Sequence, residues 1–375
     1  MSSTLAGAPE HVAARLERAR AAAREAGVDA LVVTPGPDLQ YLTGVVKHSH
    51  ERLSALLLPT EGGAAFVVPT LERPGLDGSA VEAMDVLTWT DGVDPHALAA
   101  SRLTSGAGAV RRVAVASDMP ALHVLGLRDA LPGATLELAT PILRELRMRK
   151  DTEEIASLRR AGAAIDDVHA RVPGWLVAGR TEAEVGADIT RAIVDAGHAE
   201  AAFVIVGSGP NGASPHHEVS DRVLQTGDVV VVDIGGPLPD GYNSDSTRTY
   251  VVGEPAGDVR EVYAVLQRAQ AAAVDAVRPG VTAASIDEAA RSIIRDAGYG
   301  EYFVHRTGHG IGLEVHEEPY VVDGNDLLLE PGMAFSVEPG IYFPGRWGAR
   351  IEDIVIVTDS GCESVNQRPH DLQSC

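Results

Sequence analysis

Two aspartates, Asp233 and Asp245, lie on either side of a short segment rich in glycine and proline. The apolar run at 227–233 predicts a buried strand, and the Thr-, Tyr- and Val-rich run at 242–252 predicts a second one. The turn between them has its midpoint at position 239, midway between the aspartates, so we expect the two side chains to face each other across a hairpin. Carboxylates about 5 Å apart repel each other unless a cation lies between them. The pattern therefore predicts a metal site.

A second pair of acids repeats this arrangement about a hundred residues later. The run 331–340, which contains Glu338, mirrors the first strand and its glycine-rich exit, and the run 349–357, which contains Glu352, mirrors the second strand. The two glutamates are symmetric about Gly345. Upstream of the two pairs, the segments 179–197 and 280–298 each predict an amphipathic helix that closes on Ala-Gly. We interpret these similarities as an internal duplication, which brings four acids together from two equivalent halves.

Histidines accompany both halves of this duplication. His216 and His217 follow an Asn-Gly turn in the first half, while His309 and His316 belong to a glycine-rich run in the second. That run does not predict a phosphate-binding loop, because histidines interleave with its glycines and a strand-loop-helix context is missing. Any one of these histidines alone would more often be structural. Beside four strand-borne acids, they indicate a metal centre and the groups that contact it.

Composition limits the classes of function. The chain has 375 residues, enough for two domains, and its net charge of -22 with no basic cluster argues against nucleic acid or an anionic membrane as a partner. Two cysteines, Cys362 and Cys375, provide neither a disulfide framework nor a CxxC metal site. The N-terminus lacks the pattern of a signal peptide, and no apolar run approaches 18 residues. We therefore expect a cytoplasmic protein.

The segment before the duplicated unit predicts a domain of its own. A helix at 10–27 is followed by strand patterns at 30–34, 55–58, 64–68 and 113–116, with helical patterns between some of them. This alternation predicts an α/β domain with a mixed sheet. A long helix begins at Thr152, so we place the boundary near residue 148, which gives domains 1–148 and 149–375.

Taken together, these motifs resemble the pita-bread metallopeptidases. The similar segments are Asp233-Ile234-Gly235, Asp245 with Thr247-Arg248-Thr249, 308–312, His316-Glu317, 337–340 and 350–353. Within that family the chain resembles the proline-specific branch, the Xaa-Pro aminopeptidases and prolidases, and the resemblance covers essentially the whole chain. It implies an α/β (α+β) protein with a creatinase-like N-terminal domain, followed by a pita-bread catalytic domain with an internal pseudo-twofold duplication.

The resemblance also implies roles for individual residues. Two divalent ions, most typically Mn²⁺ with Co²⁺ or Zn²⁺ as alternatives, would be held by Asp233, Asp245, His309, Glu338 and Glu352. Asp245 and Glu352 would bridge the ions, and a hydroxide shared by the ions would attack the scissile carbonyl. His216 and His316 would contact the substrate and the transition state, and Glu338 would carry a proton to the leaving nitrogen. Arg350 lies two residues before Glu352, on the same face of the strand, where it could steady the bridging carboxylates. Relatives assemble as homodimers or larger closed oligomers, so we expect a homo-oligomer.

The expected reaction is hydrolysis of the bond between an N-terminal residue and proline in small peptides. A methionine aminopeptidase would lack the N-terminal domain, whereas a creatinase-like amidinohydrolase or a non-catalytic binding protein of this fold would have lost the acids and the histidine that are present here. A strict dipeptidase needs a cation for the free carboxylate of its substrate, yet 308–345 contains neither arginine nor lysine. The remaining candidates are Arg306, Arg346, Arg350 and, from a partner subunit, Arg52 in a polar cluster (His48, His50, Glu51, Arg52) that otherwise predicts an exposed loop. Sequence therefore favours an Xaa-Pro aminopeptidase, with an Xaa-Pro dipeptidase (prolidase) as the alternative.

Overall fold

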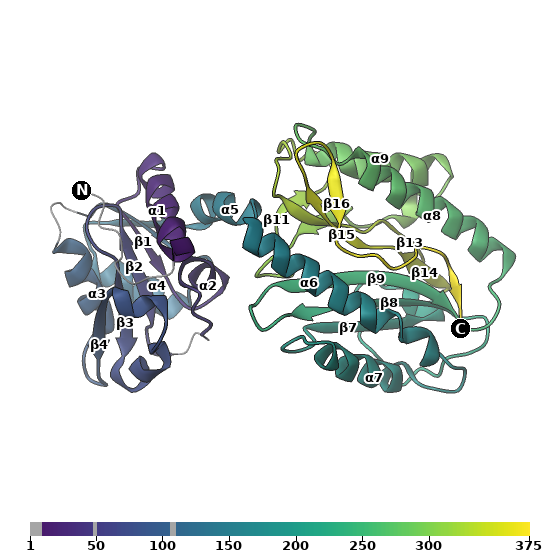
Figure 1. Ribbon diagram of the computed structural model, residues 1–375, viewed down its shortest axis with the longest axis horizontal. Helices are drawn as coiled ribbons and strands as arrows, with labels where there is room; N and C mark the ends of the chain where they lie inside the picture. Colours follow the sequence, from purple (N-terminus) through teal and green to yellow (C-terminus); the bar gives the residue numbers. More distant parts are fainter. Residues whose placement is uncertain (1–9, 48–50, 106–109) are drawn as a thin grey trace. The chain divides into compact units, whose positions relative to one another are not determined.

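The computed structural model describes residues 10–47, 51–105 and 110–375. The chain divides into two compact units, Met1–Arg147 and Met148–Cys375, coloured purple to blue and teal to yellow in Figure 1. His48 and His50 lie outside the described residues. Arg52 is described, and its guanidinium forms ion pairs with Glu51 at 2.8 Å and with Asp91 at 3.1 Å.

The N-terminal unit is built on one six-stranded mixed sheet. Its strands are β1 (Ala30–Val33), β2 (Ala55–Pro59), β3 (Ala65–Pro69), β4 (Asp85–Trp89), β5 (Arg112–Val115) and β6 (Thr135–Leu138). Their order is β4-β3-β2-β1-β5-β6, in which β2 runs antiparallel to β1 and β3 and the other neighbours are parallel. The predicted mixed sheet is confirmed.

Helices accompany this sheet. They are α1 (Glu10–Glu25), α2 (Pro37–Thr43), α3 (Pro95–Thr104), α4 (Ala121–Ala130), α5 (Thr140–Met148) and the short 3-10 helices η1 (Thr70–Leu76) and η2 (Ala80–Ala83). Every residue of β1, β2 and β3 is buried, because strands in the middle of a helix-covered sheet have no solvent face.

The C-terminal unit contains two larger sheets and a two-stranded ladder. One sheet has the order β17-β9-β8-β7 and consists of β7 (Phe203–Ser208), β8 (Val229–Pro237), β9 (Asn243–Val251) and β17 (Gln373–Ser374). The other has the order β11-β10-β12-β15-β16 and consists of β10 (Gly308–Gly310), β11 (Glu317–Val321), β12 (Ala334–Val337), β15 (Asp353–Val357) and β16 (Cys362–Ser364). The two-stranded ladder pairs β13 (Gly340–Phe343) with β14 (Trp347–Arg350).

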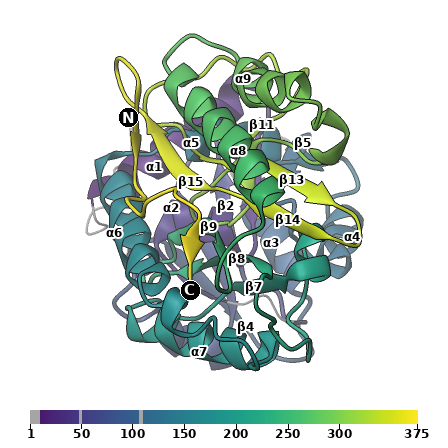
Figure 2. The same cartoon turned by 90° about the vertical axis from the view of Figure 1, so that its right-hand side faces the viewer.

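Each half of the C-terminal unit packs one pair of helices on its strands. Its helices are α6 (Thr152–His169), α7 (Glu182–Asp195), α8 (Gly257–Ala276), α9 (Ala283–Asp296) and the short η3 (Val172–Gly174), η4 (Gly209–Ala213) and η5 (Gly300–Tyr302). Apolar residues of α6 and α7 form one core with β7, β8 and β9, while those of α8 and α9 form another with β12 to β15. Figure 2 shows the two helix pairs on opposite outer sides of the strands. This arrangement confirms the predicted duplication.

The first acid hairpin differs from the prediction in its register. The ladder pairs Asp233 with Thr247 and Gly235 with Asp245, so the two aspartates are not directly opposite, and that prediction is wrong. Pro237 still pairs with Asn243, which moves the centre of the turn to position 240. Residues two apart in a strand point to one face, so Asp233 and Asp245 are diagonal neighbours on the same face.

The second acid hairpin keeps the expected register but is interrupted. The pairs Val337 with Asp353 and Gly340 with Arg350 belong to one register, so Glu338 and Glu352 lie opposite each other. The segment 349–357, predicted as one strand, is divided into β14 and β15 at 351–352. Pro339 stands opposite this break and has no N–H to continue the ladder.

Candidate metal centre

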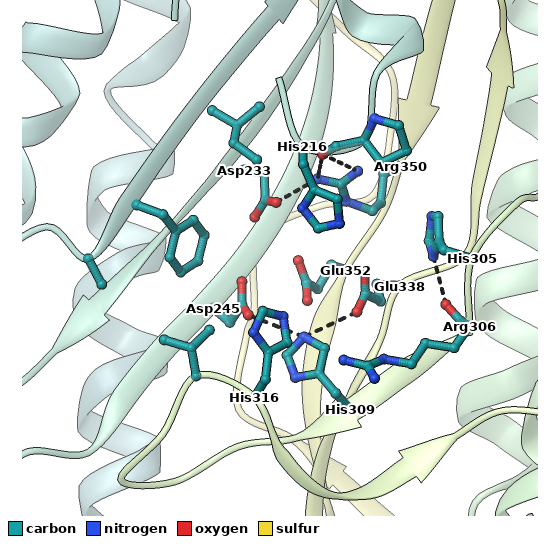
Figure 3. Close-up of a pocket in the computed structure, with 15 residues that line it drawn as sticks. His216, Asp233, Asp245, His305, Arg306, His309, His316, Glu338, Arg350 and Glu352 are labelled. Carbon is teal, nitrogen blue, oxygen red and sulfur yellow. Dashed lines mark hydrogen bonds and ion pairs between the residues drawn. The ribbon is translucent and has the colours of Figure 1, made fainter. Parts of the chain in front are cut away.

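The acids and histidines of both halves line one pocket of about 610 Å³ in the C-terminal unit (Figure 3). Every residue predicted for the site lines it: His216, Asp233, Asp245, His309, His316, Glu338, Arg350 and Glu352. The structure therefore brings together the whole predicted set, from strands and loops that are far apart in the sequence.

The two halves are joined where Glu352 leaves its own ladder. The backbone N–H of Glu352 donates to the carbonyl of Thr247 in β9 at 3.1 Å, and the Thr247 hydroxyl donates to Glu352 Oε2 at 2.7 Å. Thr247 lies two residues after Asp245, so their side chains share one face of β9. These bonds hold the acids of the second half against those of the first.

One imidazole lies among the carboxylates. His309 Nε2 is 3.2 Å from Glu338 Oε1 and 3.6 Å from Asp245 Oδ2. Its Nδ1 is 3.1 Å from the carbonyl of Gly310, which accepts a hydrogen bond only if Nδ1 carries the proton. That bond leaves the lone pair of Nε2 directed at the acids, as a metal ligand requires.

Ligand atoms of Asp245, His309 and Glu352 lie within 4.8 Å of one another, which is close enough to surround one cation. Asp233 Oδ1 is buried and has no hydrogen-bond partner among the residues that the structure describes. Buried polar atoms are nearly always bonded, so this oxygen fits a position beside a cation.

The electrostatics of the acids lead to the same conclusion. Burial raises the pKa of Asp245 and of Glu352 well above the usual range of a carboxyl group, and the neighbouring carboxylates raise both further. Burial also raises the pKa of Asp233, although the charge of Arg350 opposes that change. A cation in this cluster would remove the repulsion and let the acids ionise together. The oxygen-rich set with one imidazole therefore fits divalent metal ions.

Arg350 contacts the acids differently from the prediction. Among the described residues, its guanidinium donates to Asp233 Oδ2 at 2.5 Å, to the Thr247 hydroxyl at 3.1 Å and to the Tyr342 hydroxyl at 2.7 Å. Its contact with the expected bridging acid Glu352 therefore runs through Thr247. Arg350 is fully enclosed by protein, so it also compensates the buried charge of Asp233.

His216 and His316 lie on opposite sides of the acids in Figure 3. The ring centre of His316 is 4.1 Å from that of His309. Partial burial, together with the neighbouring His309 and Arg306, lowers the pKa of His316 to about 4. With this pKa it is neutral near pH 7 and carries one N–H that can donate a hydrogen bond.

Sequence reasoning assigned no role to Thr247, His305 or Tyr342. His305 lines the pocket, and its Nε2 lies 2.9 Å from the Tyr342 hydroxyl that Arg350 also contacts. Thr247 could have been found from its spacing, because it shares a strand face with Asp245. Nothing comparable in the sequence connects His305 with Tyr342, since they come from a loop and from β13.

The fold and the site define a metallopeptidase. Residues 156–359 match metallopeptidase family M24, and residues 15–149 match the creatinase/prolidase N-terminal domain. The chain therefore belongs to metallopeptidase family M24 and is a peptide-bond hydrolase. Among the residues described, the helices include none with the length and apolar character needed to span a membrane.

Similar proteins cover nearly the whole chain. A probable dipeptidase PepE from Mycobacterium tuberculosis is 60% identical over 97% of this chain and 96% of its own length. An Xaa-Pro dipeptidase from Lactobacillus helveticus is 38% identical over 89% of this chain and 92% of its own length. The crystal structure of dipeptidase PepE from Mycobacterium ulcerans has a TM-score of 0.93 at 59% identity, and covers 98% of this chain and 99% of that one.

Proposed function

We propose that this protein is an Xaa-Pro dipeptidase, which cleaves dipeptides with proline in the second position. The observation that carries the proposal is Arg306, whose guanidinium borders the pocket three residues before His309. It stacks 4.3 Å above the ring of Tyr320 and forms no ion pair with any other residue in the described parts of the chain. A dipeptide presents a free carboxylate one residue beyond the scissile bond, and a guanidinium matches that anion. The names of the relatives, dipeptidase and Xaa-Pro dipeptidase, support this reading.

The proposal includes a pair of divalent ions. They would be held by Asp233, Asp245, His309, Glu338 and Glu352. Bound there, such ions lower the pKa of a water and polarise the scissile carbonyl. The ligand set favours Mn²⁺, because four carboxylates and a single imidazole are a harder set than zinc usually has.

The chain's own residues would handle the protons and the developing charge. Glu338 would accept a proton from the attacking water and pass it to the proline nitrogen as the peptide bond breaks. His316, as a neutral donor, would stabilise the oxyanion from one side of the site, and His216 would contact it from the other. Arg350 would keep Asp233 in place through the bond between them.

A second candidate is the Xaa-Pro aminopeptidase that the sequence favoured. The observation in its favour is the pocket volume of about 610 Å³, which exceeds what a dipeptide alone fills and leaves room for a third residue. The two activities differ only in how the enzyme treats the atoms beyond proline, so substrate length separates them.

Replacing Arg306 by alanine is expected to lower kcat/KM for an Xaa-Pro dipeptide by about 10- to 100-fold, the usual loss for a hydrogen bond to a charged group. The same variant should cleave the corresponding Xaa-Pro amide, which lacks the carboxylate, at the wild-type rate. The assay compares Xaa-Pro, Xaa-Pro amide, Xaa-Pro-Xaa and Xaa-Ala peptides with Mn²⁺ present.

Arg346 provides a matched control, because its guanidinium is exposed and pairs with Asp258 at 2.9 Å. Arg346→Ala should leave all four rates unchanged. Faster cleavage of the tripeptide, with no effect of Arg306→Ala on any substrate, would favour the aminopeptidase. Equal cleavage of the Xaa-Ala and Xaa-Pro peptides would remove the proline-specific assignment.

Two further parts of the proposal concern the state of the protein. We infer a cytoplasmic enzyme, which is supported by the two cysteines, both free. We also infer a homodimer or larger homo-oligomer, for which light scattering should give a mass above the 39.3 kDa of one chain.

A further inference from the structure

A carboxylate outside the pocket accepts hydrogen bonds from four residues. Glu182 is the first residue of α7, and its side chain is completely buried. Oε1 accepts from the backbone N–H of Ser208 at 2.8 Å and from its hydroxyl at 2.6 Å. Oε2 accepts from His217 Nε2 at 2.8 Å and from the hydroxyl of Ser220 at 2.6 Å. Asn211 Nδ2 lies 3.1 Å from both oxygens.

These donors belong to one loop, which also carries His216. Ser208 and Asn211 precede His216, and His217 and Ser220 follow it, so Glu182 binds the loop on both sides of that residue. The His217 ring points to Glu182 and is not part of the pocket lining, whereas the adjacent His216 lines the pocket. The two consecutive histidines therefore differ in their contacts: His216 lines the pocket, and His217 bonds to Glu182.

The loop is also fixed from the side of the metal centre. The carbonyl of Pro215 accepts from the Arg350 guanidinium at 3.4 Å, and Arg350 donates at the same time to Asp233. His216 thus lies between Pro215, which Arg350 links to the predicted metal ligand Asp233, and His217, which is bonded to Glu182.

Close backbone packing leaves this loop little freedom to adjust. A Cβ on Gly212 would lie 2.8 Å from the carbonyl oxygen of Gly207, and a Cβ on Gly348 would lie 2.1 Å from that of Gly212. The loop is therefore closely packed between β7 and β14.

The charge on Glu182 suits this arrangement. Burial alone would raise its pKa, but the hydrogen bonds from Ser208, Ser220 and His217 outweigh burial, and the pKa is lowered. Glu182 is therefore an anion near neutral pH, and hydrogen bonds to an anion are stronger than those to a neutral acceptor.

We propose that Glu182 is a positioning residue for catalysis, which acts through His217 to hold the imidazole of His216 at the substrate side of the metal centre. The inference rests on the proposed function in one respect, the contact of His216 with the substrate. Glu182 itself touches neither the substrate nor the predicted ligands, so its effect must pass through the loop.

A double-mutant cycle on the metal-loaded full chain tests this dependence. Glu182→Gln keeps the shape of the side chain, but it replaces the carboxylate that accepts from the loop donors with a neutral amide. We expect kcat to fall about tenfold with metal content unchanged, since small displacements of a catalytic group have effects of this size or larger. In the His216→Ala background the same substitution should change kcat less than about twofold, because the residue that it positions is gone.

A second pair of variants isolates the bond between His217 and Glu182 and serves if Glu182→Gln does not fold. His217→Gln retains a donor near the position of Nε2 and should keep most of kcat, whereas His217→Leu should reproduce the tenfold loss. Asp188→Asn is the matched control, because Asp188 is another ion-paired acid of α7 that makes no bond to the loop. It should leave kcat unchanged.

The outcomes separate the inference from the proposed function. An equal loss from Glu182→Gln in both backgrounds, or an equal loss in His217→Gln and His217→Leu, would overturn the positioning role and leave the proposed function intact. Wild-type kcat in His216→Ala alone would remove His216 from the proposed function, and the inference would fail with it. Melting temperatures measured for every variant show that the assays compare folded proteins.

Discussion

The Glu338→Gln variant is expected to lose about 10² or more in kcat, the usual scale for a general acid-base group. Glutamine retains the shape of the side chain and one oxygen for a metal, but it cannot accept and release a proton. Burial would raise the pKa of Glu338, but the neighbouring imidazoles of His309 and His305 and the guanidinium of Arg350 lower it to about 2. The carboxylate is therefore ionised near pH 7, which is the form that can accept a proton from the attacking water.

This result requires kcat and metal content to be measured on the same sample, because a loss of metal would give the same fall in rate. Glu330→Gln is a suitable control, since Glu330 is an exposed acid that pairs with Arg149 at 2.6 Å. The control should retain full activity. If Glu338→Gln has normal metal content and normal kcat, another group moves the proton.

The second large effect distinguishes two histidines whose rings are only 4.1 Å apart. His309→Ala removes the imidazole whose Nε2 faces Glu338 and Asp245, and it should lose both bound metal and activity. His316→Ala removes a donor at the edge of the pocket, so it should keep its metal and lose about 10² in kcat, as expected for one oxyanion donor.

Metal analysis by mass spectrometry, combined with kcat for both variants, checks this pair. A further expectation follows from the pKa of His316, which is about 4: the protonation state of its imidazole should not change at any pH above about 5. Retention of metal in His309→Ala, or loss of metal in His316→Ala, would show that the ligand set is assigned incorrectly.

The sequence predicted the pocket residues more accurately than the hairpin that supplies two of them. Symmetry about Gly345 predicted the register of the ladders on both sides of Glu338 and Glu352 correctly, because that turn is short and the register continues across the interruption at Pro339. The same reasoning failed for Asp233 and Asp245. Their turn contains five residues, 238–242, and a run of glycines and prolines does not reveal where the ladder ends.

The residues that hold the site in place were harder to predict than its ligands. An acid at the start of a helix, such as Glu182, fits a favourable interaction with the helix dipole, so the sequence gives no reason to expect a loop anchor. Its partners lie 26 to 38 residues away and become neighbours only when β7 packs beside α7. The contact between Arg350 and the Tyr342 hydroxyl depends in the same way on how β13 pairs with β14.

We propose that five side chains of one folded unit hold two divalent ions that peptide hydrolysis requires. The most direct measurement removes metal with a chelator, checks the fold by circular dichroism, and then titrates Mn²⁺ while recording both binding and peptidase activity. We predict an inactive protein with an unchanged spectrum, because the ligands lie on strands that are already packed in two cores. Activity should return and level off as two ions bind per chain. Full activity in a verified metal-free sample would contradict the claim.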